Sequence, residues 1–114
     1  MDRIFEQTLL YDFYGELLTP HQRNVYEDVI FQDMSLGEVA EEHGISRQGV
    51  HDLVRRCDRI LQEYESKLHL VERFAGAKEK LREITELTGE ADGGSGSDRM
   101  RRIRELSMEL LKEL

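Results

Sequence analysis

Residues 35–56 read SLGEVAEEHGISRQGVHDLVRR. Ser35 is followed three residues later by Glu38, and this spacing is the capping-box pattern of a helix N-terminus. Gly44 readily adopts the left-handed conformation that ends a helix, and Ser46 is a good N-cap for another. The stretch therefore predicts one helix over about residues 36–43 and a second from Ser46, joined by a tight turn.

The same stretch has the spacing of a helix-turn-helix. Ala40 supplies a small side chain where the second helix has to cross the first, and Gly44 tolerates the positive φ of the turn. The apolar residues at the expected offsets, which would form the shared core, are Leu36, Val39, Ile45, Val50 and Leu53. We interpret residues 35–56 as a helix-turn-helix on the strength of this combination.

The second helix of such a motif usually enters a DNA major groove. Its outward residues here are Arg47, Gln48, His51, Asp52 and Arg55, with Arg56 and Arg59 further along to reach the backbone. Arginine binds guanine edges or phosphates, and glutamine binds adenine. Asp52 would repel phosphate, although a carboxylate can accept from cytosine.

The charge distribution leaves two interpretations open. The 114-residue chain carries a formal net charge of −8, which opposes binding to polyanions. Residues 46–59 run the other way, with four arginines against two aspartates and a net charge of +2. This face could accept phosphate, or it could simply be solvated on a trihelical core that binds no nucleic acid.

The rest of the chain also has helical periodicity. A first helix is expected over about residues 2–18, with Phe5, Leu9, Leu10, Phe13 and Leu17 as its apolar stripe. Thr19-Pro20 with Gln22 opens the next helix, which is expected to end near Phe31. From Ser46 the periodicity continues to Leu87, and one unbroken helix of about 65 Å exceeds what one small domain can bury. Either the helix folds back, with a bend near His69 or Gly76, or it packs on another subunit.

Three segments follow from these patterns. Residues 1–88 form a helical helix-turn-helix domain with a long helical extension, and residues 89–98 form a flexible Gly/Ser linker. Residues 99–114 form a short amphipathic helix. The fold class is all-α.

Three blocks in this order resemble the YlxM family, the signal-recognition-particle-associated helix-turn-helix proteins of bacteria. They are YDFYGELLTPHQ at residues 11–22, the central block at residues 35–56, and ILQEYESKLHL at residues 60–70. The central block also resembles the fourth region of sigma factors, which reads promoters. The resemblance implies a trihelical, sigma-region-four-like core of the winged-helix-like superfamily, extended by long C-terminal helices.

The resemblance also implies a homodimer with an accessory or regulatory role in the signal recognition particle pathway. The partner would be the RNA of that particle or its GTPase. The family's nucleic-acid face carries over onto Ser46, Arg47, Gln48, His51 and Arg55. Where many relatives have an aromatic residue and an alanine, this chain has His51 and Gly49.

The sequence predicts no enzyme, no cofactor and no metal site. His21, His43, His51 and His69 are not paired with each other or with Cys57 at metal-ligand spacing. No apolar run approaches the roughly 20 residues of a membrane span. A single cysteine agrees with a reducing compartment, so we expect a cytoplasmic protein with no membrane insertion.

Three hypotheses for the function remain. The first is a nucleic-acid-binding accessory protein of the signal recognition particle pathway. The second is a DNA-binding transcriptional regulator that resembles sigma-factor region four. The third is a protein-interaction adaptor that retains a degenerate helix-turn-helix.

Overall fold

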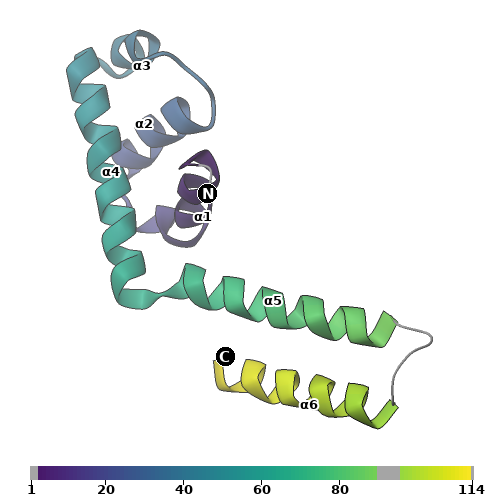
Figure 1. Cartoon of the computed structure of the whole chain (residues 1–114). Coiled ribbons are helices and arrows are strands. Elements are labelled where there is room, and N and C mark those ends of the chain that lie inside the picture. The colour runs from purple at the N-terminus through teal and green to yellow at the C-terminus, as the bar shows by residue number, and fades with distance from the viewer. Residues whose placement is uncertain (1–2, 90–95, 114) are drawn as a thin grey trace. The chain divides into compact units, whose positions relative to one another are not determined.

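The structure is a computed structural model that describes residues 3–89 and 96–113. Every regular element in these residues is a helix, which confirms the all-α fold class (Figure 1). The chain divides into two compact units, Met1–His69 and Leu70–Leu114.

The first unit contains a trihelical core. Its elements are α1 (Arg3–Tyr14), a 3-10 turn η1 (Gly15–Leu17), α2 (Pro20–Ile30), α3 (Leu36–His43) and α4 (Arg47–Leu68). Helices α2, α3 and α4 pack together (Figure 1). The fully buried side chains of Val25, Val39 and Val50 form the centre of this core, and Ala40 is also buried. The partly buried side chains around this centre are Val29, Met34, Ile45, Leu53 and Val54.

Side-chain caps fix the helix starts, as the sequence predicts. Thr19 and Gln22 form a complete capping box at α2, and Ser35 and Glu38 form another at α3. Ser46 Oγ accepts a hydrogen bond from the Gly49 N–H over 2.9 Å at the start of α4. Each cap satisfies a backbone donor that a helix N-terminus otherwise leaves without a partner.

Helix α1 packs on α4, but its buried face differs from the expected stripe. Phe5 and Leu17 are 54% and 55% exposed, whereas Gln7, Tyr14 and Leu18 are buried. Leu17 turns outward because the chain tightens into the 3-10 turn after Tyr14, and three residues per turn change the register of the apolar positions. Gln7 is buried because its amide has a partner on α4, described below.

The long helical periodicity is interrupted at His69. This residue adopts the left-handed conformation at φ 57°, and its N–H bonds to the Glu65 carbonyl over 2.9 Å, which ends α4. Helix α5 (Leu70–Gly89) begins at the next residue and passes through Gly76 without a break. Of the two bend positions that the sequence allowed, His69 is therefore the one used.

The second unit is a pair of helices. Helix α6 (Gly96–Glu113) lies beside α5 (Figure 1), and Leu106 and Leu110 are its buried side chains. Arg102 donates to the Glu83 carboxylate through Nε at 2.8 Å and Nη2 at 3.1 Å. Of the linker expected over residues 89–98, residues 90–95 lie outside the described part, and Gly96 to Asp98 belong to the first turn of α6.

Candidate nucleic-acid interface

The turn between α3 and α4 has the geometry of a helix-turn-helix. Gly44 ends α3 at φ 68° and ψ 32°, and its N–H and that of Ile45 both bond to the Ala40 carbonyl. This left-handed residue reverses the chain within one turn, so that Ser46 already caps α4. The sequence interpretation of residues 35–56 is confirmed at the level of local structure.

All seven candidate contact residues lie on the exposed surface. Val50, Cys57 and Leu61 form the fully buried side of α4, and the candidates project from its other faces. They are Ser46, Arg47, Gln48, His51, Arg55, Arg56 and Arg59. Ser46 differs from the others because its hydroxyl already serves the helix cap.

Arg47 lies across α3 at Gly37. A Cβ placed on Gly37 would come within 3.1 Å of Nη2 and 3.2 Å of Nε of Arg47. Because Gly37 has no side chain, the Arg47 guanidinium can pack directly against the backbone of α3. Both helices of the motif contribute to the position of this charge.

Asp52 occupies the centre of the exposed face of α4 and engages two candidates. Its Oδ1 accepts a hydrogen bond from Gln48 Nε2 over 2.9 Å. His51 Nδ1 lies 3.7 Å from the same oxygen. A ligand that bonded to Gln48 would first have to displace this intrahelical contact.

Two surface grooves run along α4. The first groove is lined by Arg3 of α1 and by Asp52, Arg55, Asp58, Arg59 and Gln62 of α4. The second groove lies between α4 and the start of α2, and its α4 residues are Gly49, Asp52, Leu53, Arg56 and Arg59. Arg55 and Arg56 thus face different grooves, and Arg59 reaches both. The arginines project around the helix rather than along one narrow stripe.

Asp58 fixes the far end of this surface. Its Oδ1 accepts from the Tyr26 hydroxyl at 2.6 Å and from Gln7 Nε2 at 3.0 Å, and Arg3 lies 3.8 Å from its other oxygen. Burial, and then the hydrogen bond to this carboxylate, raise the pKa of Tyr26. Sequence analysis missed this cluster, because α1 contributes two of its residues and α2 and α4 one each, and no local pattern links them.

The four arginines of the α4 surface have no acidic partner. Within residues 3–89 and 96–113, Arg47, Arg55, Arg56 and Arg59 form no ion pair with a carboxylate. Arg23 and Arg102, by contrast, pair with Glu27 and Glu83. The guanidinium groups on α4 are therefore available to an external anion.

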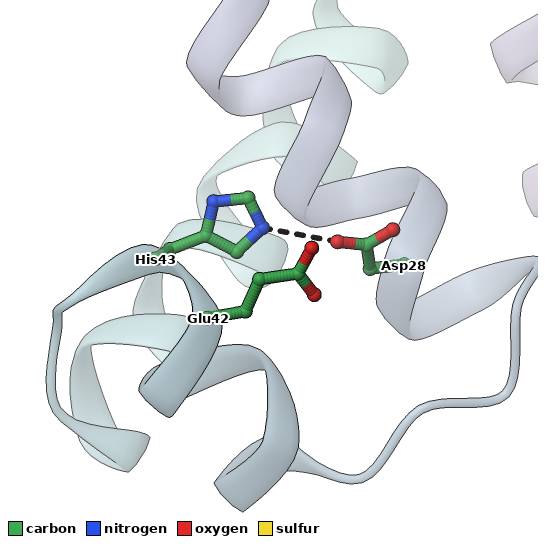
Figure 2. Close-up of side chains that lie close together, drawn as sticks. All are labelled: Asp28, Glu42 and His43. Carbon is green, nitrogen blue, oxygen red and sulfur yellow. Dashed lines mark hydrogen bonds and ion pairs between the residues drawn. The ribbon is translucent and has the colours of Figure 1, made fainter.

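A second group of polar side chains joins α2 to α3. Asp28, Glu42 and His43 place one potential ligand atom each within 4.8 Å of one another (Figure 2). The sequence predicted no metal site, because the partners of His43 in this group include a residue of another helix that sequence spacing cannot reveal.

Comparison with known proteins gives the family. The family model described as "Putative helix-turn-helix protein, YlxM / p13 like" matches residues 1–93. This chain belongs to the UPF0122 family. The UPF0122 protein of Desulforamulus reducens is 34% identical over 113 residues, which cover 99% of this chain and 97% of the relative.

Two further UPF0122 relatives match over a shorter range. The protein of Shouchella clausii is 43% identical over 84 residues, which cover 74% of this chain and 77% of its own. That of Caldanaerobacter subterraneus subsp. tengcongensis is 46% identical over 85 residues, or 75% and 73% of the two chains. These matches confirm the resemblance that the three sequence blocks indicated. In the described part of this UPF0122 protein, no helix is both long and apolar enough to cross a membrane.

Proposed function

We propose that this UPF0122 protein is a non-enzymatic nucleic-acid-binding protein and that the exposed surface of α4 is its contact surface. The supporting observation is the set of four arginines on the second helix of a helix-turn-helix, none of which pairs with a carboxylate of the described residues. Arg47 and Arg59 are separated by about 18 Å along the helix axis, at 1.5 Å per residue. Guanidinium groups spread over this length can contact several phosphates at once.

The acidic net charge does not exclude this function, since screening limits its reach. At 0.1 M salt the Debye length is about 10 Å, so carboxylates on distant helices add little to the potential at α4. They lower the affinity most at low salt, where screening is weak. We therefore expect a protein with modest affinity, and a salt slope shallower than four arginine–phosphate contacts alone would give.

The finer role that we propose is that of an accessory or regulatory protein of the signal recognition particle pathway in the bacterial cytoplasm. The family resemblance is its support, and the particle's RNA is the ligand of choice. The particle's GTPase is the alternative partner. A DNA-binding regulator resembling sigma-factor region four would use the same arginines.

A protein-interaction adaptor is the second candidate function, and Asp52 is the observation that favours it. A carboxylate in the middle of a phosphate-binding surface is unfavourable, and here it also holds Gln48. On a surface that binds a protein, an alternation of arginines with one aspartate would carry no such penalty.

The experiment is a binding titration of the full chain with labelled signal-recognition-particle RNA and with random duplex DNA, each over a series of salt concentrations. Replacement of all four α4 arginines by alanine should abolish binding. A variant with Arg99, Arg101, Arg102 and Arg104 replaced by alanine loses the same four charges away from α4 and should bind nearly normally. Binding that survives the fourfold replacement, or no binding by the unmodified protein to either nucleic acid, would refute the proposal.

We propose in addition that the protein is a homodimer. The support is the apolar surface of the second unit, where Leu81, Met108 and Leu111 are each more than half exposed. Sedimentation equilibrium at micromolar concentration tests this directly. A monomeric mass would refute the dimer and leave the nucleic-acid proposal in place.

A further inference from the structure

The last turns of α2 and α3 bring three metal-ligating side chains together. Asp28 comes from α2, and Glu42 and His43 come from α3. His43 Nε2 lies 3.0 Å from Asp28 Oδ2, and the ligand atoms of all three residues lie within 4.8 Å of one another. Figure 2 shows the Glu42 carboxylate beside the contact between the other two side chains.

These distances are close to those of a bound transition metal. With metal–ligand bonds of about 2.0–2.1 Å in tetrahedral geometry, neighbouring ligand atoms stand roughly 3.3 Å apart. On metal binding, the 3.0 Å distance between His43 Nε2 and Asp28 Oδ2 would lengthen by a few tenths of an ångström. Glu42 is exposed and has a flexible side chain, so that its carboxylate can close the remaining gap.

The charge balance of the cluster also favours a cation. In the part of the chain that the structure describes, neither Asp28 nor Glu42 pairs with a lysine or arginine. The His43 and Asp28 side chains are only 17% and 23% exposed, so water screens their charges less than it would at the open surface. Two carboxylates therefore face one neutral or singly charged imidazole.

The C-termini of α2 and α3 also favour the binding of a cation at this cluster. All three residues lie in the last turns of their helices, where the backbone dipoles place partial negative charge. Cations are stabilised near helix C-termini for this reason. Two C-termini contribute here, independently of the side chains.

A second imidazole stands nearby. The ring of His21, from the first turn of α2, has its centroid 5.8 Å from that of His43, with the ring planes at 72°. Two imidazoles that share one tetrahedral metal have centroids roughly 5–6 Å apart. His21 is not part of the three-residue cluster, but it is exposed and could reach the ion by rotation of its side chain.

We propose that Asp28, Glu42 and His43 bind a divalent transition-metal ion of the zinc class, with His21 or water as the fourth ligand. One imidazole nitrogen and two carboxylate oxygens suit such an ion, and a second imidazole would strengthen that preference. The ion would tie the last turn of α3 to α2, one residue before the Gly44 turn. Metal would then stabilise the helix-turn-helix itself, whether or not α4 binds nucleic acid.

The experiment uses the full chain, freed of metal with a chelator. Co²⁺ is titrated first, because its visible absorption reports tetrahedral coordination, and Zn²⁺ is then added in competition. We expect one equivalent to bind and the thermal midpoint to rise with Zn²⁺ concentration.

Two variants and two controls locate the ion. Glu42→Gln removes one ligand and leaves the hydrogen bond between His43 and Asp28 intact, so it should fold normally and lose roughly tenfold or more in metal affinity. His43→Gln should lose as much. Glu41→Gln and His51→Gln change a neighbouring carboxylate and a histidine outside the cluster, and should bind like the unmodified protein.

Two results would overturn the proposal. The first is no cobalt spectrum and no thermal shift for the unmodified chain, in which case the contact between His43 and Asp28 is only an interhelical hydrogen bond. The second is metal affinity unchanged in Glu42→Gln, which would place any bound ion elsewhere.

Discussion

Gln48 Nε2 donates a hydrogen bond to Asp52 Oδ1 over 2.9 Å, one turn further along the exposed face of α4. The pair joins the residue best suited to read adenine with an aspartate that would repel phosphate. This hydrogen bond occupies the Gln48 amide when no ligand is bound to α4. If α4 binds nucleic acid as we propose, Asp52 opposes that binding in two ways, by its charge and by its hydrogen bond with Gln48.

We predict that Asp52→Asn raises the affinity for nucleic acid. The amide oxygen can still accept from Gln48, so the variant tests the charge alone. One unit charge about 4 Å from a phosphate is worth about 1 kcal/mol in water, or about fivefold in affinity at low salt. Asp12→Asn, an exposed carboxylate on α1, is the matched control. Equal gains in both variants would mean that only net charge matters.

Substitutions of single residues on this surface should affect nucleic-acid binding differently, according to the kind of contact that each residue makes. Arg59 reaches both grooves and lies at the far end of the surface, so Arg59→Ala should weaken all nucleic acids about equally and lower the salt slope by about 0.9. Arg47→Ala and Gln48→Ala should instead change base preference, since these residues lie at the N-terminal end of α4, which in a helix-turn-helix bound to DNA contacts the base edges. Competition among duplexes that differ at single positions measures both effects. A uniform loss in all three variants would show that no base is read.

Local chemistry explains which parts of the fold could be predicted from the sequence. Thr19, Ser35, Gly44 and Ser46 act on backbone groups within a few residues of themselves, so their caps and turn are visible in the sequence. His69 is harder, because any residue other than glycine is uncommon at positive φ, even though histidine is among the more tolerant ones, and the periodicity continues past it. Sequence alone allowed that break without fixing its position.

Contacts between distant residues could not be predicted in the same way. Gln7 and Asp58 are 51 positions apart, and Asp28 and His43 are 15 apart. The burial of Gln7 can be explained only when α1 is known to pack on α4, because its hydrogen-bond acceptor Asp58 belongs to that helix. Helical periodicity alone placed Arg47, Gln48, His51 and Arg55 opposite the core, with Arg56 and Arg59 further along, whereas Ser46 was assigned from the family resemblance. The contacts of Gln48 and His51 with Asp52, and of Arg47 with Gly37, required the structure.

The Gly44 turn should be sensitive to substitution for conformational reasons. No atom lies within 4 Å of a Cβ built at Gly44, so Gly44→Ala creates no clash. The left-handed conformation nevertheless costs a residue with a Cβ roughly 1–2 kcal/mol, and we expect the free energy of unfolding to fall by that amount. Gly44→Asn should lose less, because asparagine tolerates this region better. Urea unfolding of both variants measures the difference, and equal losses would contradict the explanation.

The hydrogen bond from the fully buried Tyr26 side chain to Asp58 should contribute measurably to the stability of the first unit. Tyr26→Phe leaves the carboxylate without its shortest hydrogen bond and should lower the free energy of unfolding by about 1.5–3 kcal/mol, the range for bonds to charged groups. Tyr64→Phe is the control, since the Tyr64 hydroxyl forms no hydrogen bond within the described residues. Chemical denaturation of both variants should show a clear loss only for Tyr26→Phe.

Cys57 offers a direct measure of opening of the first unit. Its thiol is fully buried, and burial, followed by the charge of Asp58, raises its pKa to about 11. The folded state therefore holds the thiol proton more tightly than the unfolded state, whose thiol ionises near its ordinary value of 9.0. The stability gained from this difference is complete below pH 9 and is lost as pH rises from 9 towards 11.

At pH 8 a thiol reagent should modify the native protein far more slowly than the urea-unfolded chain, and labelling should accelerate in parallel with unfolding. Fast labelling without urea would show that α4 opens around Cys57 in the native state.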